Sequence, residues 1–292
     1  MVVTNGEITC LGAESACVSS YEGGSIVSIK LDNGYITPGL VAFGNNIGIL
    51  DISSEPSTGD GSPGRKGNAL NERKDLHFAK YGVHFGGRGF GRARLGGVTR
   101  AVTAPIFGGG LLQGVSVGLR TAENATVLGG GIWKNEVALH VAIGQEAKAE
   151  AKIPVILTGN RGAPDKWEKK NSFAGPPLSP SPAQVLIDAG VLVALAVRGD
   201  SKVHGLAQEA QWAAKFAGLS EKEAIKLVST NFNKILGLEE YRKGDSPAGN
   251  KYSGDFVVWE GNPLRGEGSV VLSVQDDGKI GDCWPDYEGA VL

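Results

Sequence analysis

The sequence has few of the residues that bind metals or cross-link chains, with three cysteines and four histidines among 292 residues. No two cysteines have metal-knuckle spacing, and an odd number argues against a disulfide framework, so we expect reduced thiols. No segment approaches the roughly 18 apolar residues that a membrane span needs. The opening MVVTNGEITCLG lacks the basic flank and apolar run of a signal peptide. These absences predict a cytoplasmic protein with no membrane partner.

An excess of charge of either sign is also missing, because 29 Lys and Arg residues face 31 Asp and Glu residues. This balance gives no broad electrostatic reason to bind nucleic acid. Glycine, in contrast, is abundant, with 45 residues. Without a collagen period, so much glycine indicates tight turns and close approaches of the backbone.

The pattern of apolar residues changes along the chain. The first 35 residues are typical of short strands and turns, including residues 6–12 and 25–31. From Ile36, apolar strand-like runs alternate with helical stretches, the pattern of a parallel sheet or a (β/α) barrel. The predicted strands of this part are 36–43, 97–105, 153–159 and 190–197, with 125–133 as a weaker one. The predicted helices are 135–152, 182–190, 204–218 and 220–237, and strands return at 255–264 and 268–284.

Both ends of the chain are therefore β-rich, and each is too small to bury a core alone. We predict a composite β-sandwich made from residues 1–36 and 246–292, beside a (β/α) barrel-like domain at residues 37–245. Five or six parallel strands can be counted, whereas a closed barrel needs eight. The barrel should thus be incomplete, with its open edge covered by glycine-rich loops or by a second copy in a homo-oligomer.

This order of parts resembles the amidohydrolase superfamily, near its imidazolonepropionase-like and fungal amidohydrolase-like branches. The resemblance lies in NGEITCLG, YITPGLVAFGNNIG and AGVLVALAVRGDS, and in AGLSEKEAIKLVSTNFNKILGLEE followed by GDFVVWEGNPL. It implies a barrel of the metallo-dependent hydrolase type and hydrolysis of a carbon–nitrogen bond in a small cyclic amide. In such enzymes metal ions activate water while an aspartate moves the proton.

The first strand lacks the metal-binding pair that the resemblance implies. Two histidines one residue apart are expected there, and Gly44 and Asn46 stand in their places. Glycine offers no side chain, and an amide oxygen is a poor substitute for imidazole toward zinc. The sequence therefore predicts no metal and no cofactor at this strand. Asn45 and Asn46 become candidates for binding a small-molecule substrate.

The four histidines form no pair with the spacing of metal ligands. His140 falls in a helical pattern, where a structural role competes with ligation. His204 precedes a helix, and contacts at the helix entry would explain it. His77 and His84 lie in a loop-rich region from which either could reach a site, and we take His84 as a candidate for substrate binding.

Asp200 matches the catalytic aspartate of the family by position. It follows the predicted strand 190–197, which should end at the mouth of the barrel, where catalytic groups usually lie. Alternatively, Asp200 only caps the segment that follows. Residues 86–97, GGRGFGRARLGG, are read as a flexible loop or as an anion-binding nest. The predicted function is hydrolysis of carbon–nitrogen bonds, and the alternative is a non-catalytic relative that binds a small molecule or a protein.

Overall fold

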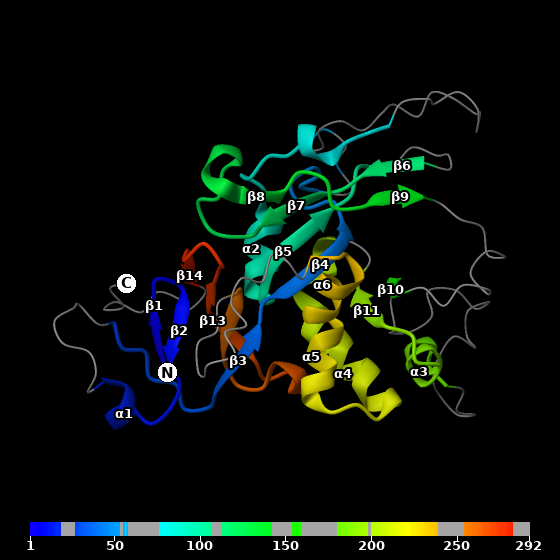
Figure 1. The fold of residues 1–292 in the computed structure, drawn as a ribbon. Coiled ribbons are helices and arrows are strands. Elements are labelled where there is room, and N and C mark those ends of the chain that lie inside the picture. Colours follow the sequence, from blue (N-terminus) through cyan, green and yellow to red (C-terminus); the bar gives the residue numbers. More distant parts are fainter. Residues whose placement is uncertain are drawn as a thin grey trace.

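The computed structural model has a mixed β-sheet at its centre, with the strand order β4-β5-β7-β8 (Figure 1). The structure describes residues 1–18, 27–52, 55, 57, 76–106, 112–141, 154–158, 180–197, 200–238 and 254–282. The central strands are Leu40–Asn45 (β4), Val98–Thr103 (β5), Val117–Arg120 (β7) and Ile132–Lys134 (β8). β4 and β5 pair in parallel, whereas β7 is antiparallel to both of its neighbours.

Helices and smaller sheets surround the central sheet. The helices are Glu14–Val18 (α1), Arg88–Leu95 (α2), Pro182–Asp188 (α3), Leu206–Ala217 (α4), Glu221–Leu227 (α5) and Thr230–Ile235 (α6). The remaining strands are Val2–Thr4 (β1), Glu7–Cys10 (β2), Gly34–Pro38 (β3), Leu112–Val115 (β6), Leu139–Val141 (β9), Val155–Thr158 (β10), Val193–Ala196 (β11), Phe256–Glu260 (β12), Ser269–Val274 (β13) and Ile280–Asp282 (β14). Short helical turns lie at Ala79–Tyr81 (η2), Val127–Gly131 (η3), Asp200–Gly205 (η6) and Pro263–Arg265 (η8).

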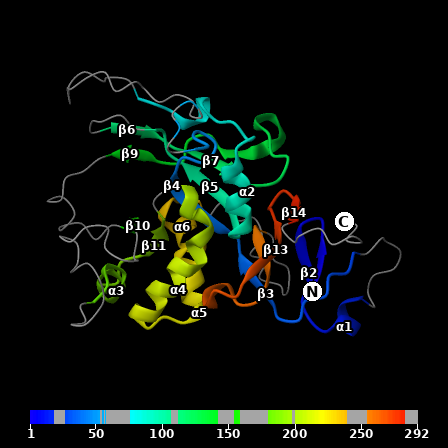
Figure 2. The same cartoon turned by 180° about the vertical axis from the view of Figure 1, so that it is seen from behind.

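Two apolar clusters cover opposite faces of β4, because alternate residues of a strand point to opposite sides. Leu40 and Ala42 belong to the larger cluster, which also contains Ala210 of α4. Val41 lies in the other cluster with Phe232 of α6. Seen from behind, α2 and α4 lie in front of the central sheet (Figure 2). Helices packed on a sheet with parallel strands give the molecule an α/β architecture.

A second sheet joins the two ends of the described chain, with the strand order β14-β13-β12-β3. All of its neighbouring strands are antiparallel. The β1–β2 hairpin is a separate sheet, and its Ile8 packs with Phe256, Val258, Val271 and Val274. The boundaries 1–36, 37–245 and 246–292 and the composite sandwich stay predictions, as does the incomplete barrel.

The strand predictions hold in part. Residues 97–105, 153–159 and 190–197 contain β5, β10 and β11, and β10 pairs with β11 in parallel. Residues 36–43 are divided between β3 and β4 at Gly39. The prediction of a strand at 25–31 is wrong over residues 27–31, which form no strand. The antiparallel β7 was not predicted.

Three other predictions are corrected by the structure. The helix predicted at 135–152 is wrong where it is described, because residues 139–141 form β9, and residues 142–152 lie outside the described part. A short apolar run fits the period of a helix as well as that of a strand. Here the run forms a strand because it pairs with β6. The helix predicted at 220–237 is two helices, because the backbone of Ser229 is not helical. The flexible loop predicted at 86–97 contains helix α2, since buried Phe90 and Ala93 anchor it despite its glycines.

The expectation of reduced thiols is wrong for two of the cysteines. Cys10 at the end of β2 and Cys17 in α1 form a disulfide, with Cα atoms 5.6 Å apart. The odd number of cysteines did not exclude a disulfide, because three cysteines can form one pair and leave one over. Cys283 lies outside the described residues.

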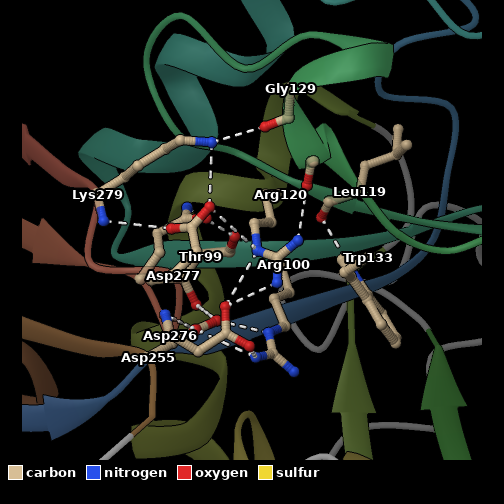
Figure 3. Close-up of polar contacts among 12 residues, drawn as sticks. Thr99, Arg100, Leu119, Arg120, Gly129, Trp133, Asp255, Asp276, Asp277 and Lys279 are labelled. Atoms are coloured by element: carbon tan, nitrogen blue, oxygen red, sulfur yellow. Dashed lines mark hydrogen bonds and ion pairs between the residues drawn. The ribbon is translucent and has the colours of Figure 1, made fainter. Parts of the chain in front are cut away.

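A salt-bridge network joins the central sheet to the second sheet (Figure 3). Arg100 of β5 donates through Nε to Asp255 Oδ2 at 2.6 Å and through Nη2 to Asp276 Oδ2 at 2.6 Å. Arg120 of β7 also donates to Asp276, through Nη2 to Oδ1 at 2.9 Å. Thr99 Oγ1 donates to Asp255 Oδ2 at 2.9 Å. Because Asp255 precedes β12 and Asp276 follows β13, these contacts fix the second sheet against β5 and β7.

Gly39 lies between the two sheets, where there is no room for a side chain. A Cβ at this position would collide with Thr99 Oγ1 and lie 2.8 Å from Asp255 Cβ. This crowding is a physical reason for glycine in the Pro-Gly-Leu sequence of this strand.

Replacing Gly39 with alanine should therefore lower the free energy of unfolding by about 1–3 kcal/mol, the usual cost of overpacking. The matched control is Gly91→Ala in α2, where an added Cβ has nothing within 4 Å. That change should instead stabilise by about 0.5–1 kcal/mol, because alanine favours a helix. Urea denaturation measures both, and equal midpoints for the two variants would contradict this account of Gly39.

Candidate functional site

The candidate site lies at the carboxyl end of β4, where the sequence placed two asparagines in a functional role. Gly44 has φ of 71° and a Cβ built on it would have nothing within 4 Å, so the space beside it is open. Asn45 is the last residue of β4 and its side chain is buried, whereas Asn46 is only partly buried. The carboxyl ends of parallel β4 and β5 meet here.

The side-chain amide of Asn45 is held in one orientation, in which its oxygen accepts a hydrogen bond and, within the residues that the structure describes, its nitrogen donates none. Its Oδ1 accepts from the backbone N–H of Ile47 at 3.0 Å. Thr103 Oγ1 lies 3.2 Å from the same oxygen, and its single proton also has a shorter bond, 2.8 Å, to the Ile47 carbonyl. The Ile47 N–H can only donate, so the oxygen must face it and the nitrogen must point away. Asn45 Nδ2 is buried and has no hydrogen-bond partner among the described residues. A buried donor without a partner costs about 1–3 kcal/mol, so Asn45 offers a donor to a water or a ligand.

Asn46 connects β4 to the end of β5. Its Nδ2 donates to the carbonyl oxygen of Ala104 at 3.1 Å, and the Ala104 N–H donates to the carbonyl of Asn45 at 2.9 Å. The amide of Asn46 therefore ties the two strand ends together. Together with the absence of a side chain at Gly44, this does not fit the metal pair that the resemblance implies, because neither position supplies an imidazole.

Two histidines approach the end of β4 from other elements. The ring of His140, on β9, stacks on Phe43 with centroids 5.6 Å apart. Burial lowers the pKa of His140, so its imidazole favours the neutral form. His77 lies across β6 from His140, and its carbonyl accepts from the N–H of Val115 at 2.7 Å. The Nε2 atoms of both histidines are buried, and within the described part of the chain neither has a hydrogen-bond partner.

His84 and Asp51 meet at the start of α2. The N–H of His84 donates to the carbonyl of Gly48 at 2.8 Å, which holds the histidine against the loop after β4. A Cβ on Gly87 would lie 3.0 Å from Asp51 Oδ1 and 3.6 Å from His84 Nε2. Asp51 Oδ1 and His84 Nε2 therefore cannot be farther apart than these two distances added together. Asp51 Oδ1 is buried, and the described residues offer it no hydrogen-bond partner.

Asp200 begins η6, the turn that follows β11 and packs against α2. Its proposed role stays a prediction. His204, at the other end of η6, lies against the backbone of Gly96 at the end of α2. This position agrees with the structural role that the sequence allowed for His204.

The structure thus brings Asn45, Asn46 and His84 to the loop that follows β4. Sequence reasoning missed Asp51, for which the only signal was its position eight residues after the end of the predicted first strand. It also missed the approach of His140, because a strand was taken for a helix. Among the described residues, no group of three or more His, Cys, Asp or Glu side chains is arranged to hold a metal ion.

Comparison with known proteins gives two amidohydrolases. No family model matches the chain. It is 31% identical over 148 residues to Amidohydrolase tasK of Hapsidospora irregularis, and this alignment covers 49% of the chain and 14% of tasK. The chain therefore matches only a small part of that relative's length. Within the described residues, no helix is long and apolar enough to cross a membrane.

The whole fold is similar to that of a solved protein. The structure resembles a crystal structure of an amidohydrolase from Thermotoga maritima MSB8, with a TM-score of 0.63 and 17% sequence identity. The match covers 98% of this chain and 94% of the Thermotoga chain. At this identity the likeness speaks for the fold, and this chain therefore has the α/β fold of that amidohydrolase.

Proposed function

We propose that this chain is an amidohydrolase-like hydrolase that opens a carbon–nitrogen bond in a small cyclic amide at the carboxyl end of β4. The similarity to tasK and to the Thermotoga amidohydrolase supports the general class. The observation that carries the proposal of a site is the buried Nδ2 of Asn45, for which the described residues supply no partner. The proposed substrate-binding residues are Asn45, Asn46 and His84.

In amide hydrolysis, the Asn45 donor would stabilise the negative charge of the reaction intermediate. When water adds to an amide carbonyl, negative charge develops on the carbonyl oxygen. A donor that is already oriented stabilises this charge without reorganising, and removing one such donor typically costs about 10²–10³ in kcat. Asn45 is oriented by the Ile47 N–H before any ligand arrives.

Asp200 is the proposed general base, by its place after β11. It would take a proton from the attacking water and return it to the leaving nitrogen. A general base alone contributes about 10²–10⁴-fold, so slow turnover is expected. No step of this mechanism uses a metal, because Gly44 and Asn46 cannot replace two imidazoles.

Replacing Asn45 with aspartate should lower kcat by about 10²–10³-fold, because the variant keeps the acceptor for Ile47 N–H and loses the donor. Rates are measured on a panel of cyclic amides and imides, with and without zinc. The control is Asn262→Asp, at the residue before η8, where Oδ1 likewise accepts from the backbone two residues later, Leu264 N–H at 2.9 Å, while Nδ2 donates to Glu221 Oε1 at 3.1 Å. That variant should keep its kcat.

Asn45→Asp also buries a carboxylate, whereas Asn45→Ala removes the donor without adding a charge. Thermal denaturation reports whether each variant is folded. Folded variants at Asn45 with the rate of the parent chain would contradict the proposed role.

The second candidate is a non-catalytic relative that binds a small molecule or a protein partner. It is favoured by the residues at the first strand, where glycine and a tied asparagine stand in the places of the histidines. Binding of a panel compound without ring opening, measured by calorimetry and mass spectrometry, would select this candidate. A homo-oligomer stays part of the proposal, and sedimentation would test it.

A further inference from the structure

We propose that His77 and His140 bind one divalent transition-metal ion between their Nε2 atoms, above Gly114 of β6. This site is distinct from the strand-one positions Gly44 and Asn46. It does not depend on whether the chain hydrolyses carbon–nitrogen bonds.

The strand register places the two histidines on either side of one glycine. His140 of β9 is the partner of Gly114 in the antiparallel pairing with β6. On the other edge of β6, Phe78 forms a parallel bridge with Val115, which places His77 level with Gly114. Residues that are level on adjacent strands point to the same face of a sheet. His77 and His140 therefore point to the same face.

The spacing of this arrangement suits two imidazoles that share an ion. Neighbouring strands are about 4.8 Å apart, so the backbones of His77 and His140 are about 10 Å apart with β6 between them. Gly114, on the strand between the two histidines, has φ of 113°, which favours glycine. An added Cβ at Gly114 would lie 2.5 Å from the carbonyl oxygen of His77 and 2.7 Å from Pro105 Cγ, so glycine lets the backbone of His77 approach β6 closely.

Both rings have an unused nitrogen. The Nε2 atoms of His77 and His140 are buried, and no residue that the structure describes is a hydrogen-bond partner of either. One orphaned nitrogen is costly, and two on the same face point to a shared ligand. The ring of His140 is also fixed, because it stacks on Phe43, which stacks in turn on Phe232 with centroids 6.0 Å apart.

The chemistry of the pair selects the ligand. Imidazole nitrogen binds zinc, copper and nickel ions well, with a Zn–N distance of about 2.0–2.1 Å, and binds calcium and magnesium poorly. Two protein ligands leave the other positions of a tetrahedral ion to water. The ion would lie near the end of β4, because His140 contacts Phe43, the residue before Gly44. Figures 1 and 2 both place β6 and β9 next to the carboxyl ends of β4 and β5.

The test uses the full chain without an affinity tag, stripped with a chelator and titrated with zinc chloride. Calorimetry should show one ion per chain, and His77→Gln and His140→Gln should each weaken binding by at least about tenfold, the loss expected for one ligand. His204→Gln should bind like the parent chain. Equal affinity in all three variants would overturn the proposal.

A second measurement needs no substitution. In the chain labelled with ¹⁵N-histidine, zinc should shift the Nε2 resonances of His77 and His140 together, and leave that of His204 unchanged. Magnesium chloride should cause no shift. A zinc-induced shift at neither of the two histidines, or at His204 alone, would also overturn the proposal.

Discussion

Replacing Asp255 with alanine should lower the free energy of unfolding by about 3–5 kcal/mol, because it leaves the buried charge of Arg100 without its main partner. The side chains of Asp255 and Arg100 are only 7% and 13% exposed, so water cannot replace the lost contact. Asp255 also accepts from Thr99 Oγ1 and from the backbone N–H of Asp276, at 2.9 and 2.8 Å. One substitution thus breaks both the ion pair and the connection between the two sheets.

The control for Asp255 is an ion pair at the surface. Glu136 accepts from Lys80 at 2.6 Å, and its side chain is 52% exposed. Glu136→Gln should cost no more than about 1 kcal/mol. Urea denaturation of both variants compares the buried pair with the surface pair. The single variant Arg100→Met and the double variant Arg100→Met/Asp255→Ala complete the cycle that measures the coupling of the buried pair. An Asp255→Ala variant as stable as Glu136→Gln would contradict the account of this interface.

Replacing Asp200 with asparagine should lower kcat by about 10²–10⁴-fold and leave KM near that of the parent chain, because the base acts only in the chemical step. The same substitution separates the two roles that the sequence left open. Asparagine caps a helical turn as well as aspartate does, so a residue that only caps would tolerate it.

Asp200→Ala completes the comparison, since alanine can neither accept a proton nor cap. If Asp200 is the base, both variants lose turnover. Full turnover in Asp200→Asn, with a lower melting temperature in Asp200→Ala alone, would show that Asp200 is a cap.

The sequence predicted well those features that depend on neighbours in the chain. The Ser-x-x-Glu spacing of Ser220 and Glu223 predicts a capping box, and the structure has its reciprocal hydrogen bonds between side chain and backbone. The position of Gly218 at the end of the predicted helix 204–218 favours a helix end, and Gly218 ends α4 in the left-handed conformation. Both features need only local hydrogen bonds and backbone geometry, which the order of residues determines.

Features that join distant segments could not be predicted in the same way. β7 became antiparallel within a sheet that was expected to be parallel, because pairing with β5 and β8 decides its direction. Arg100 and Asp255 are 155 residues apart, and no local pattern marks them as partners. The disulfide between Cys10 and Cys17 likewise depends on where α1 packs after β2.

The candidate site likewise combines local features, which the sequence predicts, with contacts between distant segments, which it does not. The strand was predicted to end at Phe43, two residues before β4 ends at Asn45. The Oδ1 of Asn45 also approaches Thr103 Oγ1 at 3.2 Å, and Thr103 lies 58 residues further along the chain. Asp51 and His84 come together only because the loop after β4 packs against the start of α2. Sequence spacing alone contains none of these contacts.

The most direct test of the proposed function is ring opening in isotopically labelled water. The purified full chain is incubated with the panel of cyclic amides and imides, and products are followed by mass spectrometry. The account predicts that at least one compound gains a single labelled oxygen as its ring opens, at a rate that Asp200→Asn and Asn45→Asp both reduce. Intact rings for every compound that binds, or an equal rate in the parent chain and both variants, would contradict it.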